Sequence, residues 1–151
     1  MKKHEEFVVP TELTPQGEKV IDAAWDEMFQ RSVDNVSTTC LLMGILKTRE
    51  STAYEVLKQH GVDEKKVDTF IRDREESDET ARLDYANVEF SFLAKCALGA
   101  SALEAKKVGA THISPEHILM GILHSTPDNM VLRFLREEGI EPDALYAELT
   151  V

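Results

Sequence analysis

Four residues in the second half of the chain are of the types that bind metal ions: His112, Glu116, His117 and His124. Zinc needs three or four such side chains to converge on one point. On a helix that begins at Pro115, Glu116 and His117 point about 100° apart, and His117 and His124 lie two turns, about 10 Å, apart. The spacing His-x-x-x-Glu-His also differs by one residue from the inverted zinc-protease motif. We therefore expect neither a metal site nor metal catalysis here.

The serine and cysteine residues lack the setting of a catalytic nucleophile. Ser37 and Ser114 each precede a short apolar stretch, where a hydroxyl caps the first turn of a helix. Cys40 falls inside such a stretch, where burial raises the pKa of a thiol and makes it inert. The sequence also contains no glycine-rich phosphate loop. These patterns favour a protein that is not an enzyme and uses no cofactor.

The composition narrows the class of protein further. The 151 residues carry a formal net charge of −11, which argues against binding to nucleic acid or to an anionic membrane surface. No apolar run approaches the roughly 18 residues of a membrane span. Cys40 and Cys96 form no CxxC motif and are interpreted as reduced thiols. We expect a cytoplasmic protein that forms a single domain, residues 1–151.

One stretch of the sequence occurs twice. The run Leu-Met-Gly-Ile-Leu stands at 42–46 and again at 119–123, an offset of 77 residues. Each run lies in a short apolar segment that a serine opens, which predicts a capped helix. The match extends upstream, where Thr14 corresponds to Ser91, and downstream after a one-residue insertion. This self-similarity predicts a tandem duplication.

The spacing of apolar residues, caps and glycines predicts an all-α fold. We expect two four-helix repeats packed about a pseudo-two-fold axis, with repeat one at about 12–73, a charged linker at about 74–89 and repeat two at about 90–149. Residues 1–12 are expected to be a loose leader. The predicted helices are 15–30, 37–47, 51–60, one from 63, 91–108, one from 115, 128–138 and 142–149.

The doubled pattern resembles the Clp N-terminal repeat domain, which leads the Hsp100 unfoldases of the ClpA, ClpB and ClpC types. The resemblance rests on the capped first helix, on the signature helix Ile-Ser-Pro-Glu-His-Ile-Leu-Met-Gly-Ile-Leu and on the helix that ends in Gly-Ile or Gly-Val, and it covers residues 12–149. It implies an all-α module that binds substrates, adaptors or regulatory partners and passes them to an ATPase ring. The sequence holds no Walker A motif, so we expect a free-standing relative without the ATPase.

The resemblance also implies candidate binding residues. ClpC-like N-domains have a threonine early in the first helix of each repeat and a Glu-His pair that opens the signature helix; the glutamate helps to hold the guanidinium of phosphoarginine-tagged proteins. The second repeat has Ser91, Glu116 and His117, whereas the first has Thr14 but Thr39 and a cysteine in place of Glu-His. At most one of the two pockets therefore keeps the pattern. The candidate protein- or peptide-binding residues are Thr14, Thr39, Ser91, Glu116 and His117.

The predicted function is a non-catalytic protein-binding module that recruits or modulates substrates or adaptors of a Clp ATP-dependent chaperone–protease. Its expected partners are a Clp ATPase or protease subunit, an adaptor, or an unfolded or tagged protein. The alternative is a decoy that sequesters a small molecule or a cyclic peptide antibiotic that targets Clp N-domains. A groove near the repeat boundary is the expected place for apolar contacts, with Phe7, Phe90, Phe92 and Met130 as candidates.

Overall fold

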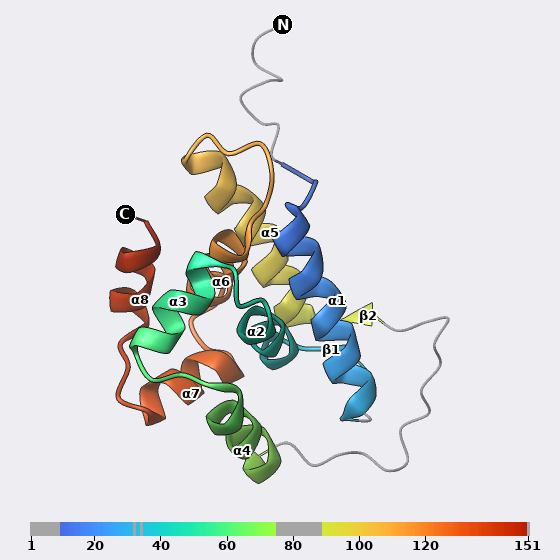
Figure 1. Ribbon diagram of the computed structural model, residues 1–151, viewed down its shortest axis with the longest axis vertical. Coiled ribbons are helices and arrows are strands. Elements are labelled where there is room, and N and C mark those ends of the chain that lie inside the picture. Colours follow the sequence, from blue (N-terminus) through green and yellow to red (C-terminus); the bar gives the residue numbers. More distant parts are fainter. Residues whose placement is uncertain (1–9, 32, 34, 75–88, 151) are drawn as a thin grey trace, which may run out of the picture.

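Figure 1 shows the computed structural model, in which helices surround one apolar core; it describes residues 10–31, 33, 35–74 and 89–150. Phe7, most of the expected leader and most of the expected linker lie outside the described residues. In chain order the elements are α1 (Pro15–Gln30), β1 (Asn35–Val36), α2 (Thr38–Lys47), α3 (Thr52–Gln59), α4 (Glu64–Arg74), β2 (Glu89–Phe90), α5 (Phe92–Lys107), α6 (Pro115–His124), α7 (Met130–Glu137) and α8 (Pro142–Leu149).

Side-chain caps explain where most of these helices begin. The hydroxyl of Thr14 accepts a hydrogen bond from the Gly17 amide at 3.0 Å, and the hydroxyl of Ser91 accepts one from the Ala94 amide at 3.1 Å. Each bond satisfies one of the amides that the first turn of a helix leaves unpaired. Helix α7 begins two residues later than the sequence suggested, because Asn129 is its cap.

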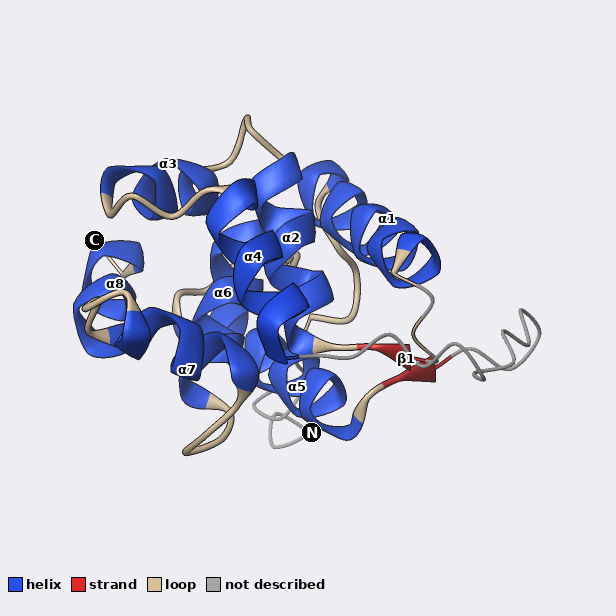
Figure 2. Ribbon diagram, turned by 90° about the horizontal axis from the view of Figure 1, so that it is seen from below, coloured by secondary structure: helices blue, strands red, loops and turns tan. Residues whose placement is uncertain are grey.

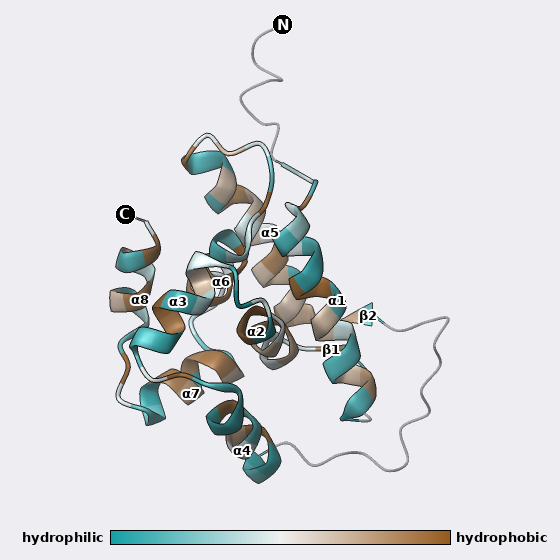
Figure 3. Ribbon diagram, in the orientation of Figure 1, coloured by the Kyte–Doolittle hydropathy of each residue, from teal (hydrophilic) through white to brown (hydrophobic). Residues whose placement is uncertain are grey.

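Helices α2 and α6 form the centre of the core. Every residue of α2 from Thr38 to Leu46 is buried, as are Pro115 and residues 118–123 of α6. Figure 3 shows the hydrophobic colouring of α2 at the middle of the molecule, with hydrophilic residues on the helices around it. Helix α1 packs closely on α2, and α5 on α6, because a glycine lies at each crossing. A Cβ added to Gly44 would lie 2.3 Å from the carbonyl oxygen of Val20, and one added to Gly121 would lie 2.2 Å from the carbonyl oxygen of Ala97.

Backbone hydrogen bonds join the first half of the chain to the second. Strands β1 and β2 pair in parallel, with Val36 opposite Phe90, and Figure 2 shows them at one edge of the helical body. At a second place Leu13 forms a parallel bridge with Ile113. A strand of two residues is too short to show an alternating pattern in the sequence, so the sequence did not predict these links. They fix the start of the first helix in each half against the other half.

Candidate functional site

The first turn of α6 holds His117 in one tautomer. The backbone N–H of Ser114 donates a hydrogen bond to His117 Nδ1 at 3.0 Å, and the Ser114 hydroxyl lies 3.0 Å from the same nitrogen. The neutral ring therefore carries its proton on Nε2. Burial lowers the pKa of His117, and this outweighs the nearby carboxylates Glu116 and Glu104, which act to raise it. His117 is accordingly a neutral hydrogen-bond donor at physiological pH.

Glu116 joins α6 to the start of α3. Its Oε1 atom accepts hydrogen bonds from the backbone amides of Thr52 at 3.0 Å and Ala53 at 3.4 Å. A carboxylate is favourable there because the N-terminus of a helix carries partial positive charge. Its second oxygen, Oε2, has no hydrogen bond to any residue in the described part of the chain, and the side chain is half-buried. Glu116 thus links α6 to α3 through one oxygen and leaves the other without a partner among the described residues.

The structure places Thr14 beside the segment that leads into α6. The Thr14 amide donates to the carbonyl of Ile113 at 3.0 Å, directly before the first turn of α6. The Ser91 amide instead donates to the carbonyl of Val36 at 2.8 Å, directly before α2. Each capping residue therefore lies beside the signature helix of the other half. We call Thr14, Glu116 and His117 together the Glu116 site.

The start of α2 offers no equivalent of this site. Thr39 stands where α6 has Glu116, but it is 2% exposed, and its hydroxyl is engaged with the Ser37 hydroxyl at 2.7 Å. Cys40, in the place of His117, is also buried. Ser91 thus lies beside a segment that presents neither a carboxylate nor an imidazole.

Two buried carboxylates were not among the residues singled out from the sequence. Glu27 on α1 is 4% exposed; it pairs with Arg31 Nε at 2.9 Å and with the Lys47 ammonium. Glu104 on α5, 77 residues later, is also 4% exposed. Glu27 follows the cap Thr14 by 13 positions, and Glu104 follows the cap Ser91 by the same 13 positions. This equal spacing was the sequence signal that could have identified the pair.

Glu104 has weaker partners than Glu27. Its Oε2 accepts a hydrogen bond from the Tyr146 hydroxyl at 2.7 Å, and the largely exposed Lys107 ammonium lies 3.4 Å from its Oε1. The hydrogen bond to Glu104, together with burial, raises the pKa of Tyr146 to about 12. The Tyr146 ring stacks on His124, with ring centroids 3.8 Å apart. A neutral phenol thus replaces one of the cations that Glu27 has.

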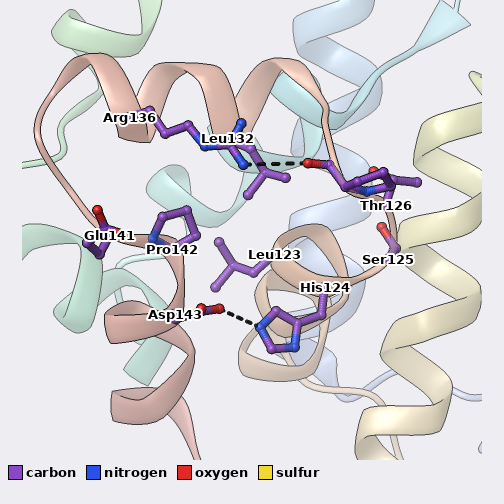
Figure 4. A pocket seen from close by; sticks show the side chains of 10 residues that line it. Leu123, His124, Ser125, Thr126, Leu132, Arg136, Glu141, Pro142 and Asp143 are labelled. Carbon is purple, nitrogen blue, oxygen red and sulfur yellow. Dashed lines mark hydrogen bonds and ion pairs between the residues drawn. The ribbon is translucent and has the colours of Figure 1, made fainter.

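A pocket of about 400 Å³ opens at the far end of α6, between α7 and α8 (Figure 4). His124 Nε2 lies 3.2 Å from Asp143 Oδ1 on one side of the pocket. Ser125 follows His124, but its buried hydroxyl oxygen has no hydrogen-bond partner among the described residues. The residue types of a hydrolase triad are therefore present without the Ser–His hydrogen bond that activates the nucleophile.

Neither a metal cluster nor a membrane-spanning helix occurs in the part of the chain that the structure describes. Within it, no group of three or more His, Cys, Asp or Glu side chains is placed to hold a metal ion. None of the helices described is both long enough and apolar enough to cross a membrane.

The fold and the Glu116 site define a mostly helical domain in which each half positions the start of a helix in the other. The chain belongs to the Clp repeat (R) N-terminal domain family, whose sequence profile matches residues 12–149. It is 25% identical over 131 residues to "Negative regulator of genetic competence ClpC/MecB" of Bacillus subtilis, and 28% identical over 111 residues to ClpC of Staphylococcus aureus. These matches cover 84% and 74% of this chain but only 15% and 13% of the relatives.

Solved structures show the same fold. The N-terminal domain of the chaperone ClpD from Arabidopsis thaliana matches with a TM-score of 0.75 and 22% identity, over 95% of this chain and 96% of that one. The ClpV N-domain, solved in complex with a VipB peptide, matches with a TM-score of 0.68 and 18% identity, over 92% and 88%.

Proposed function

We propose that this chain is a non-catalytic protein-binding module that recruits or modulates substrates or adaptors of a Clp ATP-dependent chaperone–protease. The observation that carries the proposal is the family match, which extends over residues 12–149. The ClpV N-domain, which has the same fold, was solved with a bound peptide. On this proposal the chain acts only by binding, and the ATP-dependent steps are carried out by the ATPase ring of its partner.

The Glu116 site is the proposed contact for the partner. Glu116 keeps one carboxylate oxygen for a ligand, and the next residue, His117, supplies a neutral N–H donor from the same helix turn. This combination suits a peptide that presents both donors and acceptors, or a cationic side chain. The start of α2, with buried Thr39, lacks both groups. We therefore propose one functional site per chain, beside Thr14.

We propose that this arrangement arose by tandem duplication of a four-helix repeat. Support comes from helix lengths: α1, α2 and α3 have 16, 10 and 8 residues, and so do α5, α6 and α7. Loss of the Glu-His pair from one copy then leaves a single site.

The test measures binding of the purified chain to a purified ClpC-type ATPase ring and to an unfolded model substrate such as casein. Glu116→Ala should weaken binding to one of them by about tenfold or more, as expected for a central interface residue. Glu116→Gln keeps an acceptor for the α3 amides but removes the charge. Weaker binding by this variant would therefore result from loss of the charge and not from loss of the hydrogen bonds to the start of α3. Glu55→Ala, on the exposed face of α3, is the control for removal of a carboxylate.

A second pair of variants identifies which half of the molecule is used. Thr14→Ala and Ser91→Ala each remove one N-cap hydrogen bond of similar length and should cost similar stability. Weaker binding by Thr14→Ala alone would support the Glu116 site. Equal loss in both variants, or binding by Glu116→Ala at full strength, would refute it. If no protein binds but a cyclic peptide antibiotic raises Tm, the chain is a sequestering protein instead.

A further inference from the structure

Helix α5 exposes large apolar side chains to solvent. Among the described residues, the large hydrophobic side chains that are mostly exposed are Phe92 at 77%, Leu103 at 54% and Val108 at 59%, and all three lie on α5 or at its C-cap. Phe92 and Leu103 share one face with Cys96 and Gly99, because these four residues follow one another at spacings of four, three and four. We call these four residues the α5 stripe. It lies opposite the face that packs on α6.

Packing within the chain does not require an apolar stripe there. The residues 77 positions earlier, on the same face of α1, are Pro15, Lys19, Asp22 and Asp26, and all four are exposed. Helix α1 has the same length as α5 and packs on α2 as α5 packs on α6. Two helices in corresponding positions thus differ in their outer faces, and only α5 has the composition of a contact surface.

Gly99 gives a second, independent indication. The other glycines inside the described helices, Gly17, Gly44 and Gly121, each press against a backbone carbonyl of another segment, and a Cβ there would lie within 2.7 Å of it. A Cβ added to Gly99 would meet nothing within 4 Å. A glycine inside a helix costs about 1 kcal/mol relative to alanine. Close approach of a backbone from outside the chain would give Gly99 the role that the other three already have.

The order of residues in the stripe is self-complementary. In an antiparallel pair of α5 helices related by a two-fold axis that passes between Ala97 and Leu98, Phe92 lies opposite Leu103 of the second copy. Cys96 lies opposite Gly99 of the second copy in the same arrangement. Small residues therefore meet at the centre, where the helices cross, and large residues meet at both ends.

Charge also favours a second copy at this face. The chain carries a net charge of −11, so two copies repel each other over most of their surfaces. Beside the stripe, Lys95 pairs with Glu89 at 3.4 Å, and Lys107 pairs with Glu104 at the same distance. The antiparallel arrangement also brings Lys106 to the level of Glu89 of the second copy. α5 is thus a surface on which two acidic molecules can meet without strong repulsion.

We propose that the α5 stripe is a homodimer contact, formed by two antiparallel α5 helices about a two-fold axis. It is independent of the proposed function, because it uses no residue of the Glu116 site. One helix face from each copy buries an area at the low end of specific interfaces, so the dimer is weak and dissociates on dilution.

The test is sedimentation equilibrium over a wide concentration series. The wild type should pass from monomer to dimer, and Leu103→Asp and Phe92→Asp should each raise the dissociation constant by about tenfold or more. Both positions are exposed, and Asp26 already occupies the position on α1 that corresponds to Leu103, so these variants should fold. Asp26→Asn on α1 is the matched control and should not change dimerisation. A wild type that stays monomeric, or a dimer that survives both Asp substitutions, would overturn the proposal.

A crosslinking experiment tests the register. Gly99→Cys in a Cys96→Ser background is mixed with wild-type protein, so that the introduced thiol at position 99 of one copy faces Cys96 of the other. Mild oxidation should give a mixed disulfide dimer, identified by its mass. Asp22→Cys in the same background is the control on α1 and should give none. Equal crosslinking by both variants would refute the antiparallel register.

Discussion

At the scale of single residues, His117 is held neutral because burial of its ring disfavours the charged form, while its Nδ1 accepts a backbone hydrogen bond that fixes the tautomer. The folded state lowers the pKa of His117 below the ordinary value of 6.5, so the unfolded chain takes up the proton first as the pH falls. The free energy of unfolding should therefore decrease as the pH falls through and below about 6.5.

His117→Asn keeps an acceptor for the Ser114 amide but does not titrate. We expect the wild type to lose more stability than His117→Asn between about pH 7.5 and about pH 5.5, as measured by urea denaturation at both values. Equal losses in the two proteins would mean that other groups cause the pH dependence.

Tyr146 is the principal partner of a buried carboxylate. Tyr146→Phe removes the hydrogen bond to Glu104 and leaves that carboxylate with the loosely placed Lys107. Hydrogen bonds to charged groups contribute about 1.5–3 kcal/mol, so we expect a loss of that size in thermal or urea unfolding. Tyr54→Phe is the control, because the Tyr54 hydroxyl binds no buried carboxylate among the described residues; a similar loss there would contradict the assignment.

Residue types near the site could be predicted from the sequence, but their partners could not. Glu116 and His117 were recognised by their place at the start of a capped helix. That Glu116 would bind the amides of α3, or that Thr14 rather than Ser91 would lie beside it, depends on contacts between residues about 60 to 100 positions apart in the chain. No periodicity in the sequence records such contacts.

At the scale of helices, glycine has opposite effects at two positions. A Cβ at Gly121 would collide with the carbonyl of Ala97, so Gly121→Ala should separate α5 from α6 and cost about 1–3 kcal/mol or more. Gly99→Ala meets open space and should stabilise the monomer by about 0.5–1 kcal/mol through helix propensity. Urea unfolding at low protein concentration measures both. Destabilisation by Gly99→Ala would show that its backbone is not an ordinary helical one.

Helix boundaries were predicted best where a cap or a proline marks them. The limits of α1 and α8 agree with the sequence expectation, since Thr14-Pro15 and Pro142 fix their starts. The start of α7 was wrong by two residues, because two polar residues in a row, Asp128 and Asn129, could each serve as the cap. Asn129 is the one whose amide also reaches the carbonyl of Ile122, a contact that only the fold creates.

At the scale of the whole molecule, the two halves should unfold together. Trp25, the single tryptophan, lies on α1 and packs edge-on against Phe90 of the second half, with ring centroids 5.7 Å apart, so its fluorescence reports on the contact between the halves. Asn129 is buried in the second half, away from that contact in the chain, and caps α7. Asn129→Ala should cost about 1–3 kcal/mol and shift the Trp25 fluorescence transition and the far-ultraviolet circular dichroism transition by the same amount. Two separated transitions would show that the halves are independent units.

The crossed backbone links also matter while the chain is being made. Leu13 and Val36 leave the ribosome before their partners, Ile113 and Phe90, have emerged from it. The nascent chain must therefore hold the apolar surface of α2 without its final neighbours, and that surface is a target for chaperones or for aggregation during this interval. Synonymous codon changes that slow translation between residues 74 and 113 should lengthen the exposure and lower the soluble yield, although the finished protein is identical.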